Sequence, residues 1–346
     1  MVIIMVKIHV TIKEIAKEAE VSIATVSMIL NNKDKNISEA TRNKVLKIAK
    51  NRNYIPNTMA RSLVTRQTKT IGLVMPDIVN PFFPEIARGA EDKASQARYS
   101  IIYCNTDDNL TQEDRYIDIL TEKMVDGIIF THSADREGGS TGLNRCRVPI
   151  ILIDRDYDIP NVMGKVLIDN NKASYMGVSY LLEQGYKKIA YIAGSMNTQT
   201  ARDRLEGYKR ALEDKQIDYS ESYVKIGEYK SQWGAEAAKL LIDEGLPFDA
   251  IFCGNDLIAI GAIKALKAAN LKVPGDIGVM GFDDIYMASM VEPELTTIKQ
   301  PNYEMGYRAV ELLIDAIENK NQRTDKSILE ENKIILNTEL IIRKST

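Results

Sequence analysis

Ten polar and aromatic residues of this 346-residue chain lie just beyond apolar segments that read as β-strands, at positions that side chains of neighbouring strands can share. A carboxylate or an amide can bridge adjacent hydroxyl groups, an arginine donates hydrogen bonds in a fork, and an aromatic ring covers a weakly polar face. A monosaccharide presents such hydroxyls and faces. Singly, each residue could be a salt-bridge or turn residue, but together they predict a sugar site. The set is Asn80, Phe82, Phe83, Asp154, Arg155, Arg204, Tyr229, Asn255, Asp283 and Gln300.

Catalysis is a second use for such carboxylates, because a pair of them can hydrolyse a glycoside. The sequence contains no G-x-S-x-G, Walker, G-x-G-x-x-G or H-E-x-x-H motif, and its two histidines, His9 and His132, form no catalytic pattern. The three cysteines are widely spaced and indicate neither a disulfide framework nor a zinc site. We therefore expect a binding protein rather than an enzyme, with no cofactor and no metal.

A second kind of chemistry is indicated by residues 11–32, TIKEIAKEAEVSIATVSMILNN. Thr11 and Glu14 have the spacing of a capping box, and Ser22 can cap a second short helix whose inner face is Val26, Ile29 and Leu30. This pattern is typical of a helix-turn-helix, in which the second helix enters the major groove of DNA. Ser38 is expected to cap a third helix that carries Val45, Leu46, Ile48 and Ala49 inward, and the chain then leaves the helix before Pro56.

The run VTIKEIAKEAEVSIATVS, together with NYIPN at 53–57 and ARSL at 60–63, resembles the DNA-binding headpiece of the lac repressor and galactose repressor family. The resemblance implies that residues 57–67 are a hinge helix and linker, that the hinge orders on operator DNA, and that Leu63 wedges into the minor groove. It implies base contacts from Ile23, Ala24 and Met28. The other expected DNA-contacting residues are Thr11, Ser22, Thr25, Ser27, Asn31, Ser38, Thr41, Tyr54, Asn57, Ala60 and Arg61.

Two positions depart from the family pattern. Met28 stands where many members have arginine, and arginine can pair with guanine for ~1–3 kcal/mol of discrimination, whereas methionine offers only apolar contact. We therefore expect a different operator preference at that base pair. Glu20 stands where the turn between the helices often has glycine; if the position needs a left-handed backbone, a side chain costs about 1 kcal/mol there.

From Thr70 onward, apolar strands alternate with helix-length segments, which predicts two lobes, each a doubly wound parallel sheet. Ligands bind beyond the carboxyl ends of such strands. The resemblance implies a periplasmic-binding-protein-like core whose chain crosses three times between the lobes, near 154–160, 283–292 and 319–329. We expect a headpiece at 1–56 and a core at 68–346, with the first lobe at about 68–156 and 301–325 and the second at about 161–285 and 329–346. Residues 132–146, with their glycines, are expected to form a loop where many relatives have a helix.

The resemblance extends to the ten strand-end residues, which are the types that ribose-binding proteins use on their sugar, except that Tyr229 replaces a phenylalanine. A purine pocket would favour aromatic stacking with fewer carboxylates. The neighbouring Asp256 is expected to cap the following helix. The family implies a homodimer that binds a palindromic operator.

The net charge of −3 is unevenly divided along the chain. Residues 1–66 hold 12 Lys+Arg and 5 Asp+Glu, a net +7, and the remainder holds 33 and 43, a net −10. A basic headpiece can bind phosphates while the acidic core stays off the DNA. Lys7 and His9 interrupt the apolar opening too early for a signal peptide or membrane span, so we expect a cytoplasmic protein without a membrane partner.

Two alternatives to a sugar-controlled repressor remain. A sugar-binding transport component is disfavoured by the basic headpiece and by the expected lack of a signal peptide. The final RKST and parts of the core resemble catabolite control proteins, which implies a regulator whose main partner is a phosphorylated carrier protein. Such regulators tend to lack the Asp154–Arg155 and Asn255–Asp256 pairs.

Overall fold

A computed structural model describes residues 10–31, 33–55, 67–134, 141–159, 161–318 and 331–346. The chain divides into two compact units, Met1–Thr68 and Lys69–Thr346. The expected hinge residues Asn57, Ala60, Arg61 and Leu63 lie outside the described residues.

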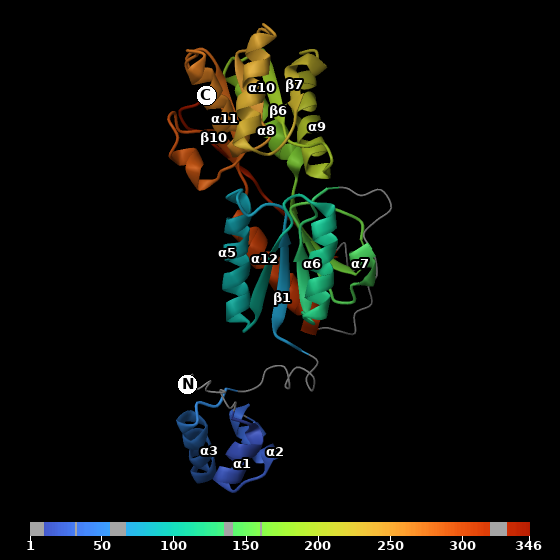
Figure 1. Cartoon of the computed structure of the whole chain (residues 1–346). Coiled ribbons are helices and arrows are strands. Elements are labelled where there is room, and N and C mark those ends of the chain that lie inside the picture. Colours follow the sequence, from blue (N-terminus) through green and yellow to red (C-terminus); the bar gives the residue numbers. More distant parts are fainter. Residues whose placement is uncertain (1–9, 32, 56–66, 135–140, 160, 319–330) are drawn as a thin grey trace, which may run out of the picture. The chain divides into compact units, whose positions relative to one another are not determined.

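Three helices of the first unit are α1 (Ile12–Ala19), α2 (Ile23–Leu30) and α3 (Glu39–Asn51) (Figure 1). Each begins at the predicted hydroxyl cap. Thr11 accepts from Glu14 N while the Glu14 carboxylate accepts from Thr11 N, and Ser22 and Ser38 accept from Thr25 N and Thr41 N. These caps satisfy N–H groups that have no partner inside short helices.

The core of this unit is small and apolar. Ile15, Val26, Ile29 and Val45 are almost fully buried and pack with Ala16 and Ala19. The prediction for Leu46 is wrong, because its side chain is 39% exposed. Val45 and Ala49, one helical turn apart, already fill the inward face of α3 and leave Leu46 on its flank.

The second unit contains two six-stranded sheets, and each defines a lobe. In the first lobe the strand order is β11-β5-β4-β3-β1-β2, and the paired strands run parallel. Its elements are β1 (Thr70–Met75), α5 (Phe82–Gln96), β2 (Ser100–Asn105), α6 (Leu110–Glu122), β3 (Gly127–Phe130), α7 (Thr141–Arg145), β4 (Ile150–Ile153), β5 (Val162–Ile168), α12 (Asn302–Glu318) and β11 (Lys333–Leu336).

The second lobe has the strand order β12-β10-β9-β8-β6-β7, with only β12 antiparallel to its neighbour among the described strands. Its elements are α8 (Asn170–Glu183), β6 (Ile189–Ala193), α9 (Gln199–Asp214), the 3₁₀ turn η1 (Glu221–Tyr223), β7 (Val224–Ile226), α10 (Ser231–Asp243), β8 (Ala250–Cys253), α11 (Asp256–Ala268), β9 (Gly278–Asp283), the 3₁₀ turn η2 (Tyr286–Ser289), β10 (Thr296–Lys299) and β12 (Glu339–Ile341).

Alternate strand residues face opposite layers of helices, as period-two geometry requires. In β3, Ile129 joins the cluster that includes α5 and α12, whereas Ile128 and Phe130 join the cluster that includes α6 and α7. In the second lobe, Tyr191 lies on the side of α8 and α9, and Ile192 on the side of α10 and α11. Both sheets are therefore covered on both faces, as the apolar strands predict.

The expected return to the first lobe at about 301 agrees with α12, but the other lobe boundaries and the three expected crossings are wrong. Strand β5, assigned to the second lobe, pairs with β4 in the first sheet, and β11 pairs with β5. The chain consequently crosses between sheets after β5, between β10 and α12, and between β11 and β12. The number of crossings is three as expected, but none lies where it was placed, because every buried strand of a parallel sheet carries the same apolar run.

The expected loop at 132–146 contains the five-residue helix α7. Cys104 and Cys253 are buried near the ends of β2 and β8, and Cys104, Cys146 and Cys253 are all free. Over the described ranges, no helix combines the length and apolar character needed to cross a membrane, and no cluster of three or more metal-ligating side chains is present.

Candidate functional site

The outer face of α2 carries the residues expected to face the bases. Ile23 is 45% exposed, Met28 is 43% exposed and Ala24 is exposed, while Val26 and Ile29 of the same helix are buried. This helix is too short to be stable alone. Its apolar outer side chains are therefore held outward by packing of the opposite face.

Hydroxyl and amide groups surround this face. Ser22 Oγ lies 2.8 Å from Thr25 Oγ1, Ser38 Oγ lies 2.8 Å from Thr41 Oγ1, and Asn31 Nδ2 donates to Ser27 O at 2.7 Å. Thr11, Ser22, Asn31 and Ser38 are exposed, whereas Thr25, Ser27, Thr41 and Tyr54 are half-buried. Two of these pairs cap helix N-termini, which attract phosphate groups.

The turn between α1 and α2 requires a left-handed backbone at Glu20, the condition under which a side chain at this position is costly. Glu20 has φ 57° and ψ 41°, which is the left-handed conformation. Its carboxylate forms an exposed ion pair with Lys44 at 3.0 Å. The absence of glycine therefore leaves strain in this turn.

The first lobe contributes Asp154 and Arg155, directly after β4. Arg155 Nη1 donates to the carbonyls of His132 and Ser133 at 2.8 and 2.6 Å, and Arg155 Nε lies 3.6 Å from Asp154 Oδ2. Asp154 has φ 67°, an unusual conformation for a residue with a side chain. Both side chains are buried.

The residues that support Arg155 were not predicted. Ser133 Oγ lies 2.7 Å from Thr106 Oγ1, and Ser133 N donates to the buried Glu113 carboxylate at 2.7 Å. This network fixes the carbonyls that hold Arg155. Thr106 and Ser133 also follow strand ends, so the strand-end rule could have indicated them.

The second lobe contributes Arg204, whose guanidinium is fixed at three points. Arg204 Nε donates to Asn170 Oδ1 at 2.8 Å, Nη1 donates to Gly254 O at 2.6 Å, and the group lies 3.8 Å from the centroid of the Phe282 ring. Asn170 was not predicted. It follows the end of β5, and assigning β5 to the first sheet would have indicated it.

Asp283 and Gln300 meet at the ends of β9 and β10. Gln300 Nε2 donates to Asp283 Oδ1 at 2.7 Å, and both side chains are buried. Asn255 caps α11 by accepting from Ile258 N at 2.9 Å. The cap was expected to be Asp256; this residue instead accepts from Ile285 N and Thr297 Oγ1.

Charges from both lobes act on one another. Burial raises the pKa of Asp283 to about 7, and Arg204 and the Gln300 hydrogen bond oppose the rise. Burial also raises the pKa of Asp154, which Arg155 and Arg204 lower. The pKa of Tyr229 is raised by burial and responds to Arg204, Arg155, Asp154 and Asp283. Arg204 therefore acts electrostatically on carboxylates of both lobes and on the Tyr229 hydroxyl.

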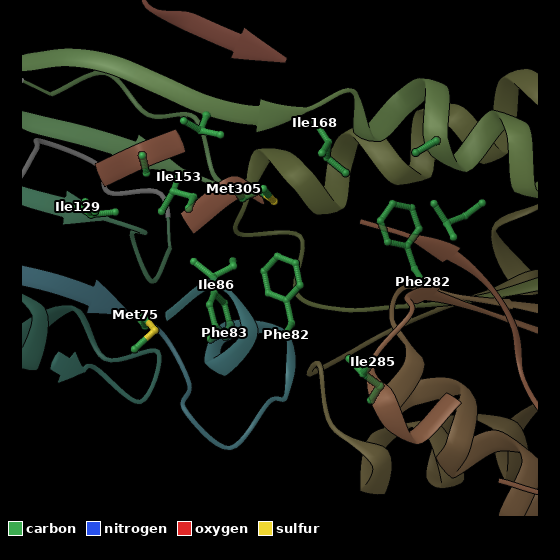
Figure 2. Close-up of a cluster of buried hydrophobic side chains, with 14 of the residues drawn as sticks. Met75, Phe82, Phe83, Ile86, Ile129, Ile153, Ile168, Phe282, Ile285 and Met305 are labelled. Atoms are coloured by element: carbon green, nitrogen blue, oxygen red, sulfur yellow. The ribbon is translucent and has the colours of Figure 1, made fainter. Parts of the chain in front are cut away.

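Phe82 and Phe83 belong to an apolar part of the same region. Their rings make an edge-to-face contact with centroids 5.0 Å apart. Figure 2 shows Phe82 between Phe83 of the first lobe and Phe282 and Ile285 of the second, all members of one buried cluster. Asn80 lies before α5, where its amide oxygen accepts from Phe82 N at 3.2 Å.

Four buried polar atoms of this site have no hydrogen-bond partner among the described residues. They are Arg155 Nε, Tyr229 Oη, Asn255 Nδ2 and Gln300 Oε1. Leaving such an atom unpaired costs about 1–3 kcal/mol. Because the four come from both lobes and include donors and acceptors, they suit a ligand that carries several hydroxyl groups.

A helix-turn-helix unit joined to a two-lobed core with a polar site defines the class of ligand-controlled DNA-binding proteins. Residues 11–57 match the family described as bacterial regulatory proteins of the lacI family, and residues 68–337 match periplasmic binding proteins and the sugar binding domain of the LacI family. The chain belongs to the LacI family. It is a DNA-binding transcriptional regulator with a sugar-binding domain, and not an enzyme.

Relatives with curated names cover almost the whole chain. The HTH-type transcriptional regulator RegA of Clostridium saccharobutylicum is 40% identical over 97% of this chain and 99% of its own length. The ribose operon repressor of Halalkalibacterium halodurans is 36% identical over 97% of each, and catabolite control protein A of Priestia megaterium is 36% identical over 93% and 96%. A solved lac repressor dimer bound to operator and an anti-inducer superposes with a TM-score of 0.85 at 26% identity, over 97% of this chain and 99% of that one.

Proposed function

We propose that this protein is a homodimeric repressor in the cytoplasm whose operator affinity is controlled by a ribose-like monosaccharide bound between the two lobes. The observation that carries the effector assignment is the set of four unpaired polar atoms beside Asp154, Arg204 and Asp283. A sugar hydroxyl both donates and accepts. It can therefore satisfy the Tyr229 hydroxyl and the Gln300 carbonyl as well as the carboxylates.

The contacts of Arg204 favour a sugar over a phosphorylated ligand. Two of its N–H groups are already occupied by Asn170 and Gly254, and its charge is opposed by Asp154 and Asp283. A phosphate would meet two carboxylates at this point. Hydroxyl groups could donate to these carboxylates and could also pair with the four polar atoms that lack partners.

The DNA assignment rests on the exposed face of α2 and on the uneven charge. Ile23, Ala24 and Met28 project outward from a helix whose hydroxyl cap can contact phosphate. A headpiece with net positive charge binds DNA with a salt-dependent affinity. We expect two such headpieces to read a two-fold operator.

Sugar binding is expected to close the cleft between the lobes and to alter how the two Leu63 hinge segments order on DNA. The coupling must be reciprocal. If the sugar lowers the affinity for operator by some factor, the operator lowers the affinity for the sugar by the same factor.

The test is operator binding by fluorescence anisotropy, using an operator selected from a random library. Affinity is measured without ligand and with D-ribose, other pentoses, hexoses and purine bases. We expect one monosaccharide to change the affinity of the natural protein and of the control Asp218→Asn, whose exposed side chain lies in the same lobe as Asp283. Asp283→Asn should bind DNA without the response; a normal response in this variant would mean that the site is misplaced.

A catabolite-control type regulator is the alternative, because catabolite control protein A is as similar to this chain as the ribose operon repressor, each at 36% identity. In that case a phosphorylated carrier protein, and no free sugar, would raise operator affinity. The same anisotropy assay with the phosphorylated and unphosphorylated carrier distinguishes the two functions.

A further inference from the structure

The turn that follows β9 has an unusual backbone at two successive residues. Asp283 has φ 114° and Asp284 has φ 56°. Residues with side chains rarely adopt positive φ, and such strain persists only where the surrounding structure holds it. The direction of the Asp283 carboxylate depends on this turn.

Asp284 is held by a residue from the far end of the sequence. Arg343 Nη2 lies 2.7 Å from Asp284 Oδ1, and both side chains are largely buried. Arg343 Nη1 also donates to Leu295 O at 2.8 Å, and Arg343 N donates to Thr296 Oγ1 at 3.0 Å. Arg343 thus links the strained turn to the start of β10.

Residues next to Arg343 are anchored in the same sheet. Ser345 is fully buried; its hydroxyl donates to Val279 O at 2.6 Å and accepts from Thr296 N at 2.8 Å. Val279 N donates to Ser345 O at 2.8 Å. The guanidinium therefore projects from a fixed segment rather than from a free tail.

The other side of the turn is fixed independently. Ile285 N donates to Asp256 Oδ2 at 2.8 Å, and the fully buried Asp256 also accepts from Thr297 Oγ1. Because Ile285 is fixed in this way, a change in the backbone of the turn would have to occur at Asp283 and Asp284. An ion pair on Asp284 is well placed to control it.

We propose that Arg343 is a positioning residue for the effector site: by holding Asp284, it aims the Asp283 carboxylate at the ligand and keeps it within reach of Gln300. The role in effector binding rests on the proposed function. The role in orienting Asp283 can be tested without any ligand.

The groups that act on Asp283 allow a ligand-free measurement. Arg204 and the Gln300 hydrogen bond lower its pKa, whereas burial and Asp154 raise it to about 7; Tyr229 and Asp256 are the other titratable groups whose pKa values respond to Asp283. If the turn relaxes, Asp283 loses the hydrogen bond from Gln300. Its titration midpoint should then rise by about one pH unit, the equivalent of one charge-assisted hydrogen bond.

The experiment titrates the Asp283 carboxyl by ¹³C NMR in the full-length protein, with the resonance assigned from Asp283→Asn. Arg343→Met and Asp284→Asn remove the two halves of the ion pair. Lys344→Met is the matched control, because Lys344 forms a neighbouring exposed ion pair with Glu294 that does not touch the turn. Asparagine tolerates a left-handed backbone, so Asp284→Asn keeps the test available if Arg343→Met does not fold.

We expect the Asp283 midpoint to rise in both variants and to stay unchanged in Lys344→Met. If the substitutions acted only through the charge they remove, the Asp283 midpoint would rise in Arg343→Met but fall in Asp284→Asn. That result would overturn the proposal, and so would an unchanged midpoint in both variants. Calorimetry with D-ribose at pH 8 should show a loss of affinity on the order of tenfold in both variants. Undiminished ribose affinity in both would also overturn the proposed role in effector binding. If midpoints shift but the natural protein binds no sugar, the positioning stands and the proposed effector fails.

Discussion

Asp283 provides the sharpest test of the site, because the properties that suit it to bind hydroxyls should make the unliganded protein less stable. Its carboxyl is buried, and its pKa is about 7, against 3.8 for an ordinary aspartate. Between these values the folded protein retains a proton that the unfolded chain has lost. The stability that the protonated Asp283 carboxyl contributes at low pH is therefore lost as the pH rises from about 4 to 7.

The two pKa values differ by about three units, which corresponds to about 4 kcal/mol. The charged, buried carboxylate should lower the free energy of unfolding above pH 7 by this amount, relative to its value at pH 4. Asparagine has the same shape, can still accept from Gln300 and carries no charge. Asp283→Asn should therefore equal the natural protein in stability near pH 4 and exceed it by up to about 4 kcal/mol at pH 8.

The assay is denaturant unfolding at pH 4 and pH 8, with calorimetric sugar titration at pH 8 on the same samples. Asp218→Asn is the control, because its side chain is exposed and should change stability little at either pH. The reasoning would be refuted if Asp283→Asn changed stability equally at both pH values, or if the variant bound sugar with normal affinity.

Three further results are expected from the headpiece and hinge. Glu20→Gly should stabilise the first unit by about 0.5–1 kcal/mol, because glycine relieves the left-handed backbone and the exposed pair with Lys44 contributes little; hydrogen exchange of α1–α3 amides measures this, and faster exchange would contradict it. Met28→Arg should shift preference toward guanine by ~1–3 kcal/mol at one operator base pair, and an unchanged ranking across an operator panel would mean that α2 is misplaced. Leu63→Ala should weaken operator binding, measured by anisotropy, while the sugar affinity measured by calorimetry stays the same. A loss of sugar affinity would contradict this, because it would mean that the substitution disturbs the two-lobed core.

The headpiece was predictable because its signals are local. Capping hydroxyls at Thr11, Ser22 and Ser38 and buried residues at helical spacing define three helices without reference to the rest of the chain. Leu46 was misjudged because a short helix buries only a narrow face, and periodicity alone does not say which flank of that face meets solvent.

Strands of the core were predictable, but their partners were not. The run at Val162–Ile168 is apolar like its neighbours, and only the pairing with β4 and β11 shows that it belongs to the first sheet. Because the assignment of β5 was wrong, Asn170 was not identified as the partner of Arg204. Contacts such as Arg343 with Asp284 join residues about sixty positions apart and leave no periodic signal in the sequence.

The central claim is that the site between the lobes binds a monosaccharide, and a calorimetric titration of the full-length protein with D-ribose tests it most directly, followed by other pentoses, hexoses and purine bases. We predict saturable binding of one sugar per chain for one member of the panel, with affinity that falls as the pH is lowered below about 7 because Asp283 takes up a proton. A protein that binds operator DNA but none of these sugars would contradict the claim and favour control by a phosphorylated carrier protein.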